Sequence, residues 1–374
     1  MKKEVSDLFV SFTSLIVTIF ISSQLIITNT VMPRLYDATV NELGRYSFTF
    51  DAYEFIEKDE QKSVIAIGSS KMREIFDGLE IKNQTAYDAM YYNLAYAGDR
   101  PYVRMVEIDA IIKSNPDLVI IEYGPNYLSK LNSPLSDTIS HRMSHLISIN
   151  SEWHSPSWLG MVDDHDLPYL PLDRISQLEY IQTLTPVSVE KTIAFGIDYE
   201  EPPYDCNRES NNVWCVPYVN DPEYLEYLQY PTQFGNALER IKGGYRTTTI
   251  EEFYGPMLDD YINRSYHNPE GVFNKNVQSL EFIIDSLIGS GVHVILVGLP
   301  YNPVLLDRLA EGQWDYYNTT YDYFKSTKSI HMVDYLWTDY WIEEDFNDYT
   351  HASRAGELKF SELISKEIDY IMMD

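Results

Sequence analysis

Basic residues are scarce in this chain, and several familiar signatures are missing. The 374 residues include 28 Lys and Arg against 57 Asp and Glu, so the formal net charge is −29 at pH 7. Because binding to a nucleic-acid backbone requires a basic surface, this charge argues against a nucleic-acid partner. No internal repeat and no low-complexity tract occurs. The strand-like segment Gly291–Gly298 lacks the closely spaced glycines and the helix start of a dinucleotide-binding fingerprint.

Cysteine is almost absent, since Cys206 and Cys215 are the only two in the chain. They lie in a polar segment with eight residues between them. Outside the cytoplasm they would close a small disulfide loop, and in a reducing compartment they would remain thiols. Three glycosylation sequons begin at Asn83, Asn263 and Asn318, although such triplets also arise by chance in a chain rich in Asn, Ser and Thr.

The amino terminus contains the one long hydrophobic run. Residues 8–33 carry no charge and are mostly Leu, Ile, Val and Phe, and this run exceeds the roughly 20 residues that span a bilayer as a helix. Lys2 and Lys3 precede it, which favours a cytoplasmic amino terminus. We therefore expect residues 1–33 to be a single-pass membrane anchor, with the rest of the chain outside the cytoplasm. A cleaved signal peptide is the alternative, but the run is long and no small-residue cleavage pattern follows it.

After the anchor, residues 34–61 are polar and aromatic, and we expect a partly helical stalk that packs onto the domain. Residues 62–374 predict an α/β domain in which strands alternate with helices. The expected strands are Val64–Gly68, Met90–Ala95, Asp117–Tyr123, Gly291–Pro300 and Ser329–Tyr335. The expected helices are Lys71–Leu79, Tyr102–Ser114, Asn276–Ser290, Pro303–Gly312 and Ala355–Tyr370. This alternation predicts a flavodoxin-like three-layer α/β/α fold with about five parallel strands and right-handed crossovers.

The region at about 128–275 lacks this alternation and is rich in Tyr, Pro, Asp and Glu. A segment of that length cannot be a single loop inside a compact domain. We expect a mainly helical or irregular insertion that covers one edge of the sheet.

The segment Val64–Phe76 combines a strand, a turn and a helix start. An apolar run ends at Gly68, and Ser69 and Ser70 follow it. Serine at such a turn lies at the carboxyl edge of the sheet, where open α/β folds bind their ligands. The ordinary alternative is that one of these serines is only the N-cap of the helix.

A second informative segment precedes the last expected helix. Asp348 lies three residues before His351, so the carboxylate can orient the imidazole within a single turn. The other ring nitrogen is then free to accept a proton from a serine hydroxyl, which needs such a base near neutral pH. Alternatively, Asp348 caps the helix and His351 is an ordinary half-buried histidine.

Four blocks fall at the carboxyl edge of the expected sheet: Gly68-Ser69-Ser70, Gly98, Gly124-Pro125-Asn126 and Asp348 with His351. Over about residues 62–127 and 290–370 this pattern resembles the SGNH (GDSL-type) hydrolase superfamily. The resemblance implies that Ser70 is the nucleophile, that His351 is the general base and that Asp348 orients His351. It also implies an oxyanion hole formed by the backbone N–H groups of Ser70 and Gly98 and by the Asn126 side chain.

The chain departs from the family pattern at two points. Gly68-Ser69-Ser70 stands in place of Gly-Asp-Ser, and Tyr127 replaces the aspartate that follows the family's Asn. The Gly-Ser-Ser form is similar to membrane-anchored members that move acyl groups on cell-surface polymers, such as alginate O-acetylation proteins and the D-alanyl-transfer protein of teichoic acids. The resemblance therefore implies an esterase or O-acyltransferase that acts through an acyl-serine intermediate on a cell-surface glycan or polymer. A transferase would also require a membrane protein that donates the acyl group, and no cofactor is implied.

Two other functions remain open from the sequence. The chain could be a non-catalytic SGNH-like module for binding or assembly. It could also be a metal-dependent hydrolase that uses histidines of the insertion. His141 and His145 have the spacing of metal ligands on one helical face, and the run at 163–166 is Asp-Asp-His-Asp. A solvated helix face and an acidic loop are the ordinary interpretation, and we expect no resident metal.

Overall fold

The computed structural model describes residues 10–20, 22, 42–59, 61–96, 98–131, 134–149, 156–173, 175–177, 179–180, 262, 273–309 and 314–373. These residues form an α/β fold around a five-stranded, all-parallel sheet with the strand order β2-β1-β3-β4-β5. The strands are β1 (Ser63–Ile67), β2 (Met90–Asn93), β3 (Leu118–Tyr123), β4 (His293–Gly298) and β5 (His331–Asp334). This is the doubly wound order of flavodoxin-like sheets, whose ligand crevice lies where the strand order reverses, between β1 and β3.

The sheet is buried on both faces, which explains its continuous apolar strands. In β1, Ile65 and Ile67 belong to one hydrophobic cluster, whereas Val64 and Ala66 belong to the cluster on the opposite face. The same alternation continues through β3 and β4. Successive side chains of a strand point to opposite faces, so each apolar run supplies both cores.

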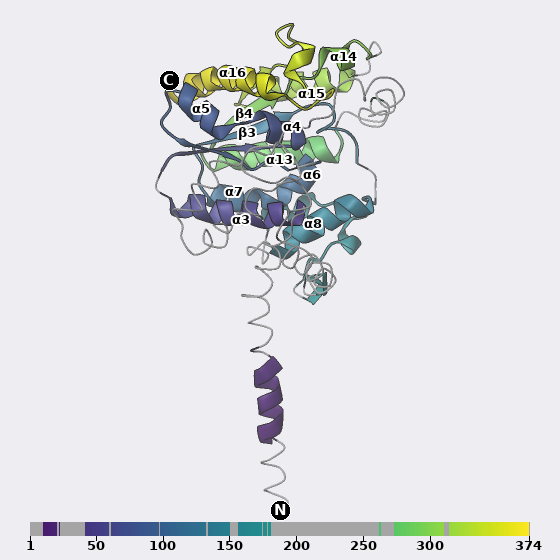
Figure 1. The fold of residues 1–374 in the computed structure, drawn as a ribbon. Coiled ribbons are helices and arrows are strands. Elements are labelled where there is room, and N and C mark those ends of the chain that lie inside the picture. The colour runs from purple at the N-terminus through teal and green to yellow at the C-terminus, as the bar shows by residue number, and fades with distance from the viewer. Residues whose placement is uncertain are drawn as a thin grey trace, which may run out of the picture.

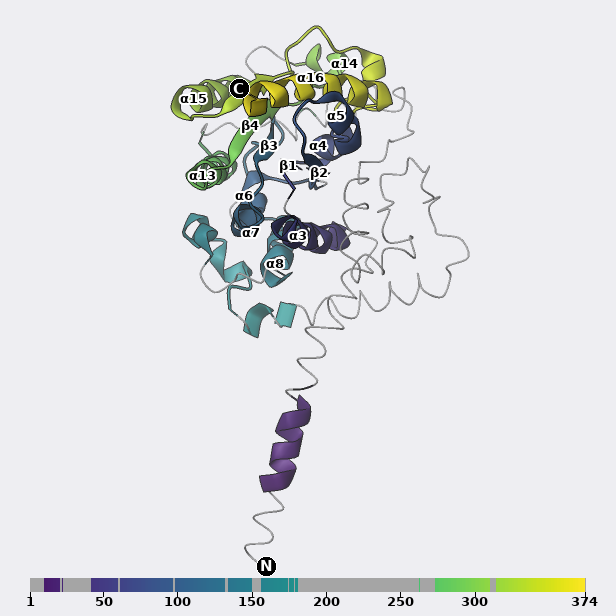
Figure 2. The same ribbon diagram turned by 90° about the vertical axis from the view of Figure 1, so that its left-hand side faces the viewer.

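Helices cover both faces of the sheet (Figures 1 and 2). The first face packs against α4 (Ser70–Ile75), α5 (Gly78–Gln84) and α16 (Arg354–Met373). The second face packs against α6 (Pro101–Arg104), the 3-10 turn η2 (Met105–Glu107), α7 (Ile108–Lys113), α13 (Lys275–Gly289) and α15 (Asp315–Thr327). The short helix α14 (Pro303–Leu306) follows β4. The three-layer arrangement therefore agrees with the α/β fold expected from the sequence.

Four helices differ from the expectation. The predicted helix Tyr102–Ser114 is divided by the 3-10 turn η2 into α6 and α7. The predicted helix Lys71–Leu79 is two helices, because the chain turns at Asp77, whose carboxylate caps α5 through the Leu79 and Glu80 N–H groups. Gly78 allows the turn, since a Cβ atom there would lie 2.2 Å from the Tyr91 carbonyl oxygen. The predicted helix Pro303–Gly312 ends at Leu306. The fourth, α15, was missed, because its buried face consists of Tyr, Thr and Phe instead of aliphatic residues.

The expected stalk contributes to the core of the domain. It contains α3 (Glu42–Lys58), which packs against α7 and α8 (Asp137–Ile149) (Figure 1). Ala52, Tyr53 and Ile56 of α3 are buried. The Tyr53 hydroxyl donates a 2.8 Å hydrogen bond to Oε2 of the buried Glu107, so α3 is tied to the domain by a polar contact as well as by packing.

Residues 10–20 are helical, and their large apolar side chains are exposed. Among the described residues, no helix is both long and apolar enough to cross a bilayer. The described part of the insertion contains α8 and the 3-10 turns η3 (Ser157–Met161) and η4 (Leu167–Tyr169). Asn83 on α5 and Asn318 on α15 are exposed. The predicted disulfide of Cys206 and Cys215 and the sequon at Asn263 lie outside the described residues.

Candidate active site

The candidate site lies at the carboxyl ends of β1 and β3. Gly68 follows β1 and lets the Ser69–Ser70 turn approach the neighbouring strand, because a Cβ atom there would lie 2.6 Å from Cβ of Glu122 and 2.8 Å from Cβ of Met72. The turn then passes directly into α4. This close approach explains why glycine stands before the two serines.

The two serines of the turn have different roles. Ser69 is the N-cap of α4, and its Oγ accepts a 3.3 Å hydrogen bond from the Lys71 N–H. Ser70 is the first residue of α4, and its Oγ lies 2.8 Å from Nε2 of His351. Ser69 is therefore the capping serine of the turn, whereas the Ser70 hydroxyl contacts the imidazole.

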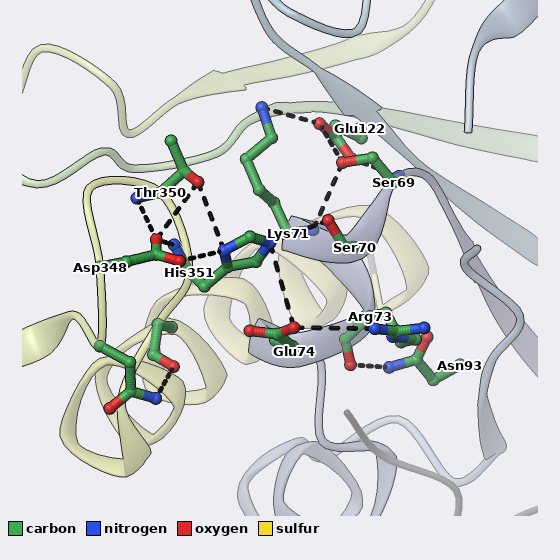
Figure 3. A network of polar contacts seen from close by, with 12 residues as sticks. Ser69, Ser70, Lys71, Arg73, Glu74, Asn93, Glu122, Asp348, Thr350 and His351 are labelled. Atoms are coloured by element: carbon green, nitrogen blue, oxygen red, sulfur yellow. Dashed lines mark hydrogen bonds and ion pairs between the residues drawn. The ribbon is translucent and has the colours of Figure 1, made fainter. Parts of the chain in front are cut away.

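His351 connects Ser70 to Asp348 (Figure 3). Its Nδ1 lies 2.7 Å from Oδ2 of Asp348, while its Nε2 faces Ser70. A carboxylate acceptor at Nδ1 places the proton on that nitrogen and leaves Nε2 as the acceptor for a hydroxyl proton. The structure thus brings the three residues of the predicted triad into one hydrogen-bonded chain.

Asp348 is held in its ionised form. Burial by itself would raise the pKa of its carboxyl, but the charge of His351, the hydrogen bond from its ring and two backbone N–H donors together lower the pKa below its usual range. The backbone donors are the N–H groups of Thr350 and His351, each 2.8 Å from Oδ1. An ionised carboxylate at this position stabilises the imidazolium that forms when His351 accepts a proton.

The turn that carries Asp348 and His351 is closed by its own backbone. An antiparallel bridge joins Phe346 to Ala352, and the Asn347 N–H donates a 2.8 Å hydrogen bond to the His351 carbonyl. Asn302, which precedes α14, donates to the Asp348 carbonyl through Nδ2 at 3.3 Å. These contacts fix the base relative to the sheet and not only relative to its own loop.

A second buried group of charged residues surrounds the turn that carries Ser70, and the sequence alone did not predict it. Glu122, the penultimate residue of β3, accepts the Ser69 N–H at 2.6 Å and the Ser69 hydroxyl at 3.0 Å. The same carboxylate lies 3.2 Å from the Lys71 ammonium, which also contacts the Tyr301 hydroxyl and lies over the Tyr301 ring. Glu122 and Lys71 are buried. Because Glu122 contacts both Ser69 and Lys71, it holds the turn on either side of Ser70. Glu122 could have been noticed in the sequence, because it is a charged residue inside the apolar run Leu118–Tyr123 and therefore needs a partner when the strand is buried.

The predicted oxyanion residues Gly98 and Asn126 lie on the loops that follow β2 and β3. The Arg142 guanidinium of α8 donates to the Gly98 carbonyl at 2.7 Å. Arg100 donates to Oδ1 of Asn126 at 2.8 Å, which leaves Nδ2 as the donor end of that amide. In the described part of the chain neither residue makes a hydrogen bond to Ser70, so their role as oxyanion donors stays a prediction.

The residues considered for a metal site have other partners. Asp166 accepts hydrogen bonds from the Tyr102 hydroxyl at 2.8 Å and from the Lys275 ammonium at 2.6 Å. His141 and His145 lie on α8. Within the described ranges, no group of three or more His, Cys, Asp or Glu side chains is arranged to hold a metal ion.

The site therefore combines a serine hydroxyl, an imidazole base and an ionised carboxylate at the crevice of a doubly wound sheet. Such a chain of groups can deprotonate a serine as it attacks a carbonyl carbon. No family model and no curated protein sequence matches this chain. The functional assignment consequently depends on the geometry of the site and on the resemblance of its motifs.

Proposed function

We propose that this chain is a serine-dependent acyl-ester hydrolase or O-acyltransferase that works through an acyl-Ser70 intermediate. The observation that carries the proposal is the chain of contacts from Ser70 Oγ to His351 Nε2 (2.8 Å) and from His351 Nδ1 to Asp348 Oδ2 (2.7 Å). These distances lie within the range expected of a nucleophile, its base and the group that orients the base. The resemblance to SGNH hydrolases supports the same assignment.

The first half-reaction forms the acyl-enzyme. Ser70 Oγ bonds to the carbonyl carbon of an ester while its proton moves to His351 Nε2, and the carbonyl oxygen becomes an oxyanion. The predicted donors for that oxyanion are the Ser70 and Gly98 N–H groups and Asn126 Nδ2. The tetrahedral intermediate then collapses: the ester C–O bond breaks, and the leaving oxygen takes the proton from Nε2.

The second half-reaction transfers the acyl group. An acceptor hydroxyl, from water or from a glycan, gives its proton to His351 Nε2 as its oxygen attacks the acyl carbon. Collapse of this second intermediate breaks the bond to Ser70 Oγ, and the proton returns to Ser70. Asp348 stabilises the imidazolium in both halves and takes no proton.

A glycan or cell-surface polymer as acceptor is part of the proposal. Exposed aromatic side chains such as Trp337 and Tyr340 follow β5 at the same edge of the sheet as the triad. Exposed aromatic surface at the edge of the sheet that carries the triad suits the stacking of sugar rings. We also propose that residues 1–33 anchor the domain outside the cytoplasm, a proposal supported by the uncharged run at 8–33. If the acceptor is a glycan, a membrane protein would supply the acyl group.

Labelling with a fluorophosphonate tests the proposed nucleophile. Purified full-length protein in detergent should react once, and peptide mass spectrometry should place the adduct on Ser70. Ser70→Ala should abolish the labelling, while Ser69→Ala, which removes only the adjacent hydroxyl, should keep the adduct on Ser70. Equal labelling of wild type and Ser70→Ala, or no labelling of a folded wild type, would reject the proposal and favour a non-catalytic module. Loss of ester hydrolysis with a chelator would instead favour the metal-dependent alternative.

A further inference from the structure

A second carboxylate faces the base from the helix that carries the nucleophile. Glu74 follows Ser70 by four residues, so both side chains project from the same face of α4. Glu74 is buried, and its Oε1 lies 4.0 Å from His351 Nε2 (Figure 3). The imidazole therefore lies between Asp348 on its Nδ1 side and Glu74 on its Nε2 side.

The charged side chains near His351 come from its own loop and from α4. Asp348 comes from its own loop, and Glu74 and Arg73 come from α4, where the Arg73 guanidinium lies 3.7 Å from the same oxygen of Glu74. The remaining cation of this turn, Lys71, lies 3.2 Å from Glu122 of β3. A carboxylate at about 4 Å favours the cationic form of an imidazole, and Arg73 offsets part of that effect.

We propose that Glu74 is a positioning residue that acts electrostatically on His351 and raises the pH at which this base becomes neutral. The inference rests on the proposed function, since it concerns the proton that Ser70 gives to Nε2 while Oγ bonds to the carbonyl carbon. Glu74 accepts no proton in this step. At 4.0 Å it stabilises the imidazolium by charge, while Ser70 keeps the hydrogen bond to Nε2.

Direct titration of His351 tests this role without turnover. Full-length Ser70→Ala protein with ¹³C-labelled histidine is titrated by NMR in detergent, and the signal of His351 is identified by its loss in His351→Gln. Glu74→Gln should lower the titration midpoint by about one pH unit, the lower end of the shifts caused by a neighbouring charge. Glu362→Gln, which changes an exposed carboxylate of α16, should leave the midpoint unchanged.

Glu74→Ala also removes the charge, so it serves if Glu74→Gln does not fold, whereas Glu74→Asp keeps the charge and should retain most of the shift. A midpoint that stays the same or rises in the folded Glu74→Gln or Glu74→Ala variant, or that falls as far in Glu74→Asp as in Glu74→Gln, would overturn the inference. In enzyme with Ser70 intact, the acid limb of kcat/KM should move to lower pH by the same amount in Glu74→Gln. Absence of fluorophosphonate labelling in the wild type would reject the proposed function alone, since the NMR titration does not depend on catalysis.

Discussion

Ser70 Oγ and His351 Nε2 lie 2.8 Å apart although 281 positions of sequence separate the two residues. The first strand delivers the serine to the carboxyl edge of the sheet, and the loop before α16 returns the imidazole to that edge. Asn302 holds this loop through the Asp348 carbonyl. The contact between Ser70 and His351 therefore depends on the whole sheet and on the buried groups that hold the two loops.

Asp348→Asn should abolish most of the activity without unfolding the protein. An amide cannot hold Nδ1–H and stabilise an imidazolium as a carboxylate does, so kcat for hydrolysis of an activated ester should fall by at least about 1,000-fold. Ester hydrolysis and circular dichroism on the same preparation measure both effects. Asp339→Asn, a change at an exposed position after β5, should leave kcat unchanged. Retention of kcat in Asp348→Asn would show that this carboxylate does not orient the base.

Gly68→Ala should destabilise the protein and disturb the Ser69–Ser70 turn. The added methyl group would meet Cβ of Glu122 at 2.6 Å, and overpacking of this kind costs about 1–3 kcal/mol. We expect a lower thermal midpoint and slower labelling of Ser70. Gly289→Ala is the matched control, because a Cβ atom there meets nothing within 4 Å and the residue lies in α13. That variant should match or exceed the wild type in stability, and equal midpoints for the two variants would contradict the prediction.

Glu122→Leu should destabilise the fold strongly, because it leaves the buried Lys71 ammonium without its carboxylate. Removing one partner of a buried ion pair costs about 3–5 kcal/mol. The double variant Lys71→Met/Glu122→Leu should regain much of this loss, since neither member of the pair is then left as an unpaired buried charge. A double-mutant cycle of thermal or urea unfolding gives the coupling energy. Additive effects of the two substitutions would show that the 3.2 Å contact contributes nothing.

Asp99→Asn should change the pH dependence of stability. Burial raises the pKa of Asp99 to about 6, the charge of Arg104 opposes the rise, and Glu107 adds to it. The folded state therefore holds the proton of Asp99 more tightly than the unfolded state, whose carboxyl titrates near 4. As the pH rises through about 6, the folded state must bury an anion, so this residue becomes more destabilising.

The thermal midpoint of Asp99→Asn, relative to wild type, should thus be higher at about pH 7.5 than at about pH 5. The exposed variant Asp322→Asn provides the comparison at both pH values. A difference between Asp99→Asn and wild type that is the same at both pH values, or that falls with rising pH, would show that burial does not raise the pKa of Asp99.

Local patterns predicted β1, β3 and β4 because each is a largely apolar run bounded by turn residues. The shorter strands β2 and β5 were also predicted, although each contains polar residues. The break at Asp77 was missed because it depends on the approach of Gly78 to the Tyr91 carbonyl, a contact that only the folded chain creates. The proximity of Ser70, His351 and Asp348 was predictable because they lie in two short motifs, one directly after β1 and one in the loop before α16. For Glu122 the sequence offered one signal, a carboxylate inside an apolar run, but its partner Ser69 is far away in the sequence. Glu74 offered no signal, because its contact with His351 exists only in the folded chain.

With the proposed anchor in a bilayer, the burial of α3 would limit how far the domain can move from the membrane. If residues 1–33 anchor the chain as proposed, the eight residues 34–41 are all that joins the membrane to a helix whose Ala52 and Ile56 are locked into the core. Even a fully stretched tether of eight residues reaches no more than about 28 Å. The domain would therefore stay close to the membrane surface, and its substrates would have to come within that distance of the membrane.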